Sequence, residues 1–443
     1  MKNCLKEYLK FTRLLMIYHL VNRMDENIIM SPFSIQMLLS LISDATAGTA
    51  HNEVIRALEG GSIGLGSARR GSTAGQENAG RGSAVGQENA GRGSMAGQRR
   101  PVRRSASGQE ISEWLIYIQE RMGRSPAFAS SNAVCLRQDI GSSVNDKFRE
   151  HLENFYNGEI ISSSDPVGDV NRWAARVSRG MINKIADKSM SNVLAFMLNC
   201  VVFESKWRYI YEDVKLDFTN ADSSVKKVPM MAGMAEYYLE NKYFTGFLRP
   251  YEDRAFYFMG LLPKKEAIAA FRRKAQARQE AIGGLHQEMR TEKNATDREA
   301  EQKIPNRDFW THALYETDFT RLYDSRTSSY DLHVIMPEFK SEFTTNLESF
   351  CNELGMKEIF SHNADFSPMT SEQIFLESII QKARIEVDRH GTRAAAISMG
   401  AMPKSIGAHV RERRVVRLDR PFLYAIVECM NGMPVFEGIL NQI

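Results

Sequence analysis

Along much of the chain, apolar residues recur every three or four positions, which is the spacing of one face of an α-helix. This pattern predicts helices at 7–23, 35–46, 111–122, 144–156, 170–182 and 347–354. Elsewhere, short runs rich in β-branched and aromatic residues predict strands. They lie at 195–203, 226–231, 255–262, 331–338, 379–387 and 422–427. Strands outnumber clean β-α-β units and hairpin-like spacing dominates the second half, so we expect an α+β fold with mixed or antiparallel sheets.

Two stretches lack a core-forming pattern, and the first is 60–108. The sequence GQENAGRGS occurs there at 75–83 and again at 86–94, and large apolar residues are almost absent. Such a segment buries too little apolar surface to offset the entropy of ordering, so we expect it to be disordered. We interpret it as a repeat expansion tolerated in a surface loop. The alternative is that its Arg-Gly-Ser repeats bind an anionic polymer, such as RNA or a glycan.

The second stretch, 267–305, is charged and favours helix but has no sustained apolar stripe. We therefore expect a solvated helical insertion. It contains the only glycosylation sequon of the chain, at Asn294, which matters only if the protein is secreted.

Composition excludes some classes of protein. The net charge is +3, so the chain as a whole is not strongly attracted to polyanions. No apolar run approaches the roughly 18 residues of a membrane span. The amino-terminal stretch 1–24 has no clean signal-peptide pattern and is read as an amphipathic helix. The five cysteines are too scattered for a metal site or a disulfide framework, so we expect mostly buried free thiols and no cofactor.

Motifs of enzyme chemistry are also absent from the sequence. There is no G-x-S-x-G, no H-E-x-x-H, no phosphate-binding G-x-x-x-x-G-K, and no G-x-G-x-x-G after a strand. The nine histidines do not cluster with carboxylates or cysteines. We expect a protein that is not an enzyme.

Several stretches instead resemble the serpin family, and they stand in the family's order. They are ENIIMSPFSIQMLLSLISDATAGTAHNEVIRAL (26–58), NRWAARVSRGMI (171–182), LNCVVFESKW (198–207), KKVPMM (226–231), NELGMKEIFSHNADFSPMT (352–370) and VRLDRPFLYAI (416–426). The resemblance covers nearly the whole chain except the two insertions. The chain is similar to an animal serpin. The resemblance implies a single domain over 1–443 with a large central sheet, a second sheet stack, surrounding helices and an exposed reactive loop at 389–414.

The resemblance also implies a function. Serpins inhibit serine proteases as suicide substrates: the protease cuts the reactive loop, and the amino-terminal part of the loop inserts into the central sheet as a new strand. We therefore expect a monomeric, extracellular inhibitor whose partner is a serine protease, with no membrane partner. The alternative is a non-inhibitory binding or carrier protein on the same scaffold.

The tract RHGTRAAAISMGAMPK (389–404) has the pattern that insertion requires. Alternate residues of an inserted strand face inward and must be small or apolar. The inward set is Thr392, Ala394, Ala396, Ser398, Gly400 and Met402, and the outward set is Arg393, Ala395, Ile397, Met399, Ala401 and Pro403. No inward residue is charged. The resemblance makes Gly391, Thr392, Ala394, Ala395, Ala396 and Ser398 the hinge of the loop; taken alone, the tract also fits an ordinary linker.

Two departures from the family bear on function. The hinge has basic residues, Arg389, His390 and Arg393, where the family usually has acidic ones, and this change is the reason to keep the carrier alternative open. Gln381 stands where the family's central-sheet histidine is expected. The matching residues of the sheet-opening machinery are Ser31, Ser34, Asn199 and Trp207.

Counting from the hinge glycine places the scissile bond at Lys404–Ser405, within a residue. A lysine before the bond suits a trypsin-like protease, whose specificity pocket holds a carboxylate. The rival bait is the multibasic tract with Arg411, Arg413 and Arg414, which resembles a proprotein-convertase site.

Overall fold

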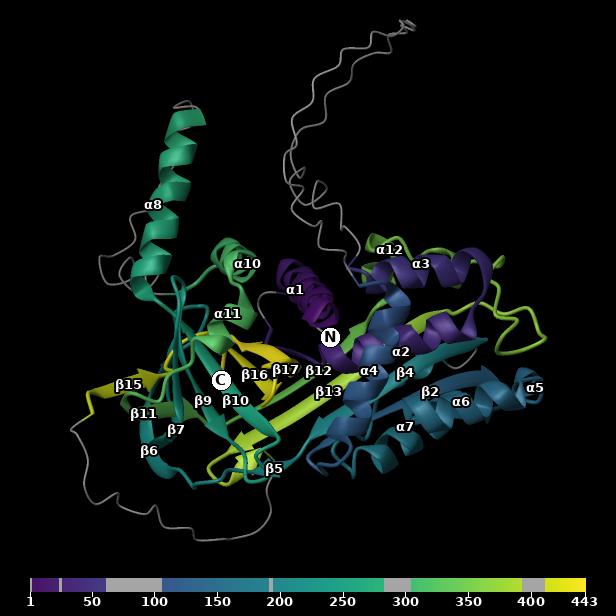
Figure 1. Cartoon of the computed structure of the whole chain (residues 1–443), viewed down its shortest axis with the longest axis horizontal. Helices are drawn as coiled ribbons and strands as arrows, with labels where there is room; N and C mark the ends of the chain where they lie inside the picture. Colours follow the sequence, from purple (N-terminus) through teal and green to yellow (C-terminus); the bar gives the residue numbers. More distant parts are fainter. Residues whose placement is uncertain (1, 24–25, 61–105, 191–193, 283–303, 393–410) are drawn as a thin grey trace, which may run out of the picture.

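The structure is a computed structural model that describes residues 2–23, 26–60, 106–190, 194–282, 304–392 and 411–443. For 279–282 it describes the backbone only. Helices and three sheets are packed together in one body (Figure 1). The fold is α+β, as the sequence predicts, with one large core that extends through most of the elements.

The central sheet has the strand order β3-β2-β4-β13-β14-β5, and β12 also pairs with β13. Its strands are β2 (Phe128–Arg137), β3 (Gly158–Ser163), β4 (Ala195–Phe203), β5 (Ser205–Lys206), β12 (Phe339–Asn346), β13 (Ser378–Asp388) and β14 (Gly391–Thr392). The β2–β3 and β4–β13 pairs are parallel, whereas the other pairs are antiparallel. The sheet is therefore mixed, which confirms that prediction.

The other two sheets stack beside the central one. The larger is antiparallel throughout, in the order β1-β17-β16-β10-β9-β8, and the smaller has the order β15-β11-β7-β6. The strands are β1 (Ile28–Met30), β8 (Tyr237–Glu240), β9 (Phe244–Pro250), β10 (Phe256–Pro263), β16 (Phe422–Glu428) and β17 (Pro434–Leu440) in the first, and β6 (Glu212–Thr219), β7 (Val225–Met234), β11 (Asp331–Pro337) and β15 (Arg413–Arg417) in the second.

The described α-helices surround these sheets (Figure 1). They are α1 (Lys2–Arg23), α2 (Pro32–Ala45), α3 (Gly48–Leu58), α4 (Gly108–Met122), α5 (Gln138–Gly141), α6 (Asp146–Tyr156), α7 (Pro166–Val177), α8 (Lys265–Ile282), α10 (Arg307–Glu316), α11 (Phe319–Asp324) and α12 (Glu348–Glu353). Short 3₁₀ turns lie at Lys188–Met190 and Glu358–Phe360. None of these helices is long and apolar enough to span a membrane, and no described group of His, Cys, Asp and Glu is arranged to hold a metal ion.

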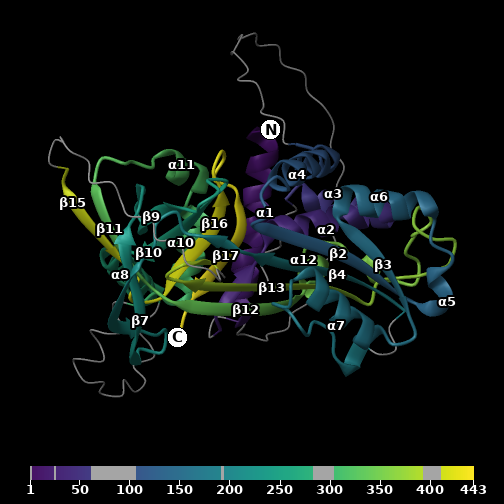
Figure 2. The ribbon, with the colours of Figure 1, turned by 90° about the horizontal axis from the view of Figure 1, so that it is seen from below.

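Strand β4 is buried on both faces, which explains why its sequence is apolar except for Asn199. Its alternate residues Phe196, Leu198, Cys200 and Val202 pack with the apolar side of α7 in a separate small core. The residues between them, including Met197 and Val201, belong to the main core, which includes α2. Figure 2 shows α7 and α2 on opposite faces of this sheet.

Helix α2 lies against the sheet and is almost wholly buried. It begins at a defined point because the Ser31 hydroxyl accepts the backbone N–H of Ser34 at 3.2 Å, and Pro32 occupies the first turn. This cap places Ser31 and Ser34 directly behind the central sheet.

Some predicted boundaries are wrong. Ala106 is buried, Ser107 caps α4 and Gly108 opens that helix, so the folded part resumes before the end of the expected 60–108 insertion. The described start of the second insertion is helical, but α8 begins earlier, at Lys265, and anchors Ile268 in the core. Asn294 lies outside the described residues, as does the repeat itself.

Candidate functional site: the hinge and the sheet seam

The central sheet has a seam where β4 and β13 run parallel, with Phe196–Val202 paired to 378–384. Beyond the end of this pairing, β14 lies between β13 and β5. Gly391 pairs with Lys206 and Asp388, and Thr392 pairs with Ser205 and Val387. The first two residues of the hinge are therefore already in the sheet, at the position where an inserting strand would enter.

The two residues of β14 fit this place for different reasons. A Cβ on Gly391 would lie 2.3 Å from the carbonyl oxygen of Ser205, so only glycine allows the strands to approach this closely. Thr392 is fully buried, and its hydroxyl shares a 2.7 Å hydrogen bond with the Tyr251 hydroxyl. Burial raises the pKa of Tyr251 well above its usual value, so this phenol stays protonated. The Tyr251 ring in turn stacks on Trp207 at 4.6 Å.

A tight turn feeds the chain from β13 into β14. The Asp388 carboxylate accepts the backbone N–H groups of His390 at 2.7 Å and of Gly391 at 3.1 Å. The segment after β5 holds the other side of the turn. Trp207 donates its indole N–H to the Asp388 carbonyl at 2.7 Å and its backbone N–H to the His390 carbonyl at 2.9 Å, and the Tyr211 N–H reaches the Arg389 carbonyl at 3.2 Å.

The changed charge of the hinge meets carboxylates. The guanidinium of Arg389 forms an ion pair with Asp213 on β6, and its backbone N–H donates to the Glu338 carboxylate at 3.3 Å. Its Nε also donates to Nε2 of His390 at 3.1 Å, which requires that ring nitrogen to be the acceptor. An acidic residue at position 389 would lose the ion pair with Asp213, so the basic residue suits this surface.

Gln381 occupies the centre of the seam. Its amide donates to the Ser31 carbonyl at 3.1 Å and to the Asn199 side-chain oxygen at 3.0 Å, and its oxygen accepts the Ser31 N–H at 2.9 Å. Ser31 also donates to the Val435 carbonyl and contacts Ser34 at 2.9 Å. The glutamine therefore joins β13 to both α2 and β4, and these bonds must rearrange if a strand is to enter the seam.

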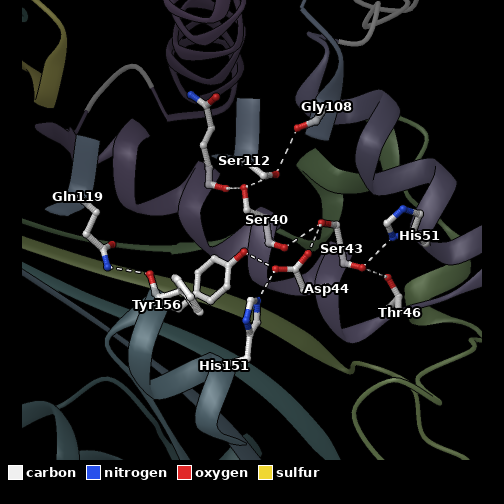
Figure 3. A network of polar contacts seen from close by, with 12 residues as sticks. Ser40, Ser43, Asp44, Thr46, His51, Gly108, Ser112, Gln119, His151 and Tyr156 are labelled. Carbon is white, nitrogen blue, oxygen red and sulfur yellow. Dashed lines mark hydrogen bonds and ion pairs between the residues drawn. The ribbon is translucent and has the colours of Figure 1, made fainter. Parts of the chain in front are cut away.

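The same polar network continues away from the seam. Asn199 donates to Asn132 at 3.0 Å, and Asn132 donates to the Tyr156 carbonyl at 2.6 Å. Figure 3 shows its far end, where Tyr156 and His151 on α6 both approach the Asp44 carboxylate of α2, at 2.5 and 2.9 Å. The path thus ties the sheet to α6 and α2.

Residues 10–309 and 308–443 match the family model described as Serpin (serine protease inhibitor). The chain belongs to the serpin family. Among curated relatives, Serpin-Z4 of Arabidopsis thaliana is 27% identical over 332 residues, which cover 68% of this chain and 72% of the relative.

Solved serpin structures share the fold at low identity. The native state of the thermophilic serpin tengpin aligns with a TM-score of 0.69 and 19% identity, covering 99% of this chain and 94% of that one. Thyroxine-binding globulin in complex with thyroxine aligns with a TM-score of 0.66 and 16% identity, covering 100% and 99%. The relatives include both plant and animal proteins, so the expectation of an animal serpin stays a prediction.

The structure divides the residues that the sequence grouped as sheet-opening machinery. Ser31, Ser34 and Asn199 meet at Gln381 in the seam, whereas Trp207 lies at the hinge and holds the turn before β14. Of the hinge, Gly391 and Thr392 are described. The other expected hinge and bait residues lie outside the described residues, namely Ala394, Ala395, Ala396, Ser398, Lys404 and Ser405.

The rival bait and the end of the loop need correction. Arg413 and Arg414 are not loop residues, because both belong to β15, which pairs in parallel with β11. The Arg414 guanidinium lies over the rings of Tyr330 and Tyr238, at 4.3 and 5.2 Å. A protease needs an extended, accessible bond, so Arg414 is a poor bait in this fold, while Arg411 is exposed and precedes the strand.

Other residues of the site were missed from the sequence. Tyr251, Asp388 and Asp213 carry no motif that marks them, and they contact the hinge from the end of β9, the end of β13 and β6. For Tyr251, the preceding Pro250 was a signal in the sequence, because proline ends strand β9 and so places Tyr251 at the end of the sheet.

Proposed function

We propose that this serpin inhibits a trypsin-like serine protease as a suicide substrate, through cleavage at Lys404–Ser405. The observation that carries the proposal is the position of β14: the strand that must insert has already begun to do so, between β13 and β5. Family membership supports protease inhibition in general, and the identity of Lys404 supports the trypsin-like class.

The entry of the hinge supports the insertion step in particular. Inserting the rest of the tract would add ladder hydrogen bonds to β13 and β4 and bury further small side chains. The residues that follow Thr392 in the inward set are Ala394, Ala396 and Ser398, none of which is charged or bulky. A strand with this sequence can enter a closed sheet without burying an unpaired charge.

The test is incubation of the protein with trypsin, followed by a denaturing gel and sequencing of the released carboxyl-terminal fragment. We expect a complex that survives denaturation and a new amino terminus at Ser405. Lys404→Ala should abolish this complex with trypsin, whereas Arg411→Ala should leave it unchanged. Complete cleavage without complex would refute the inhibitory function, and a fragment that begins elsewhere would refute the bait.

A non-inhibitory carrier is the alternative. Open grooves of about 640 Å³ beside the hinge and about 480 Å³ beside α1 and α10 have the volume of a small-molecule site, whereas the enclosed cavity of the fold does not. One enclosed apolar cavity lies between α1, β10, α11 and β17, lined by Leu9, Met259, Phe319 and Glu437 among others. Its volume is about 20 Å³, room for a single water. Small-molecule sites typically measure ~300–1,000 Å³, so a carrier function here would require the lining side chains to move.

Export and polymer binding are further proposals that rest on the sequence alone. Secretion would make Asn294 a glycosylation site, which mass spectrometry of the protein purified from its source would detect. Binding of an anionic polymer by the Arg-Gly-Ser repeat predicts later elution from a heparin column than for a variant that lacks 61–105.

A further inference from the structure

A cation is buried beside the hinge without a carboxylate partner. Arg249 on β9 is 1% exposed, and no described carboxylate lies within ion-pair distance of it. Its two terminal nitrogens donate to the backbone carbonyls of Met234 and Tyr209, and its Nε has no partner. The guanidinium also lies over the Tyr211 ring, 3.5 Å from the centroid, and 5.7 Å from that of Trp207.

Stability alone does not explain an arginine at this position. Removing a charge from water costs free energy that two carbonyl contacts and an aromatic face offset only in part. Burial lowers the pKa of Arg249 from its usual value, which reflects this cost. An apolar side chain of similar volume would avoid this desolvation cost, so an arginine at this position has to be explained by what its guanidinium contacts.

The two carbonyl partners indicate that explanation. Tyr209 lies in the segment 207–211, whose Trp207 and Tyr211 N–H groups hold the carbonyl groups of His390 and Arg389. Met234 ends β7, in the neighbouring sheet. Arg249 thus fastens the strip that holds the hinge to a strand that does not take part in insertion. The fit is tight, because a Cβ on Gly233 would lie 2.8 Å from the guanidinium.

We propose that Arg249 is a positioning residue that keeps the start of the reactive loop, Gly391–Thr392, inside the sheet before any protease acts. By fixing the strip 207–211, it makes the first step of insertion part of the uncut state. The second part of the proposal concerns inhibition and rests on the proposed inhibitory function: an anchored start lets the cut loop insert before the acyl-enzyme is hydrolysed. Without the anchor, more of the protein would be cut as a substrate.

Hydrogen exchange of the uncut protein tests the first part without a protease. In Arg249→Met, the amides of Trp207 and Tyr211, which donate to the carbonyls of His390 and Arg389, should exchange about ten-fold faster or more once the strip is released; we call this hinge exchange. Arg420→Met is the control: Arg420 is also buried and bonded to a backbone carbonyl, that of Pro263, and it is paired with Asp419 at 3.0 Å, but it lies away from the hinge. We expect hinge exchange in this control to match the parent.

A second variant guards against misfolding of the first. Gly233→Ala keeps the charge, but its Cβ would lie 2.8 Å from the guanidinium and 2.9 Å from the Tyr211 ring, so it should raise hinge exchange in the same direction by a smaller factor. The proposal is overturned if Arg249→Met and Gly233→Ala leave hinge exchange at the parent's rate, or if Arg420→Met raises it equally.

A protease measurement tests the second part separately. The number of inhibitor molecules consumed per trypsin inactivated should rise several-fold in Arg249→Met and stay unchanged in Arg420→Met. A parent that forms no stable complex would refute the inhibitory function, while the exchange result would still decide whether Arg249 holds the hinge. Faster hinge exchange with an unchanged stoichiometry would overturn the claimed consequence for inhibition.

Discussion

Replacing Glu437 with glutamine should stabilise this protein at neutral pH. Glu437 is buried on β17, and burial raises its pKa from 4.5 to about 8, against the opposing influence of Arg13. The folded protein therefore keeps a proton that the unfolded chain releases above about pH 4.5. The stabilisation is complete below that pH and is lost as the pH rises to about 8, which corresponds to ~5 kcal/mol in total and ~3 kcal/mol at about pH 7. Glutamine has a similar shape and cannot ionise.

Urea denaturation of both proteins at several pH values measures this effect. The two curves should nearly coincide at about pH 4.5 and separate by ~3 kcal/mol at about pH 7, in favour of Glu437→Gln. Glu428→Gln is the control, because the buried Glu428 carboxylate is paired with Arg121 at 3.1 Å, so its loss should destabilise the protein. Parallel pH dependences for the parent and Glu437→Gln would show that the carboxyl group titrates normally and that its burial is misjudged.

Three further results are expected at the hinge. Thr392→Arg would place a guanidinium at a fully buried position, at a cost of several kcal/mol, so the protein should turn from inhibitor to substrate. The control is Arg393→Glu, on the predicted outward face, which should still form complex. Equal complex formation by both variants would refute the inward assignment of Thr392. Cutting the loop near Lys404 should raise the melting temperature, because the new strand adds ladder pairs, and an unchanged value in a thermal scan would reject insertion. Arg389→Glu should weaken hinge protection in hydrogen exchange, and Asp213→Lys in the same chain should restore part of it; no recovery would show that the ion pair does not position the hinge.

Elements with a strong local pattern could be predicted from the sequence. Strand β4 has the predicted bounds, because eight of its nine residues are apolar and all nine are buried in the sheet. The strand predicted at 422–427 is β16, but the sequence does not predict β15 just before it, which lies in a different sheet. The break between these two strands falls at 418–421, where Pro421 cannot donate to a ladder, and the Leu418 N–H still bonds to Ile335 of β11.

The geometry of the site depends on contacts that local patterns do not encode. Thr392 and Tyr251 are 141 positions apart, and Arg389 and Asp213 are 176 apart. Nothing in the alternation of small residues after Gly391 indicates that the first two have already entered the sheet. That position is set by Trp207 and Tyr211, whose N–H groups face the turn only because the segment after β5 is held in place.

The partners of the hinge bear on the choice between inhibitor and carrier. The reason to doubt inhibition was that basic residues replace acidic ones before the hinge glycine. In the structure, the Arg389 guanidinium is paired with Asp213 and its backbone N–H donates to Glu338, so the basic side chain is matched by an acidic one rather than left in conflict with its surroundings. The same holds in the seam, where Gln381 bonds to Ser31 and Asn199 through both ends of its amide. The departures at Arg389 and Gln381 are thus accompanied by partners that suit them, while Arg393 lies outside the described residues. The described part of the hinge, with Gly391 against Ser205 and the buried Thr392 bonded to Tyr251, is therefore compatible with the proposed insertion.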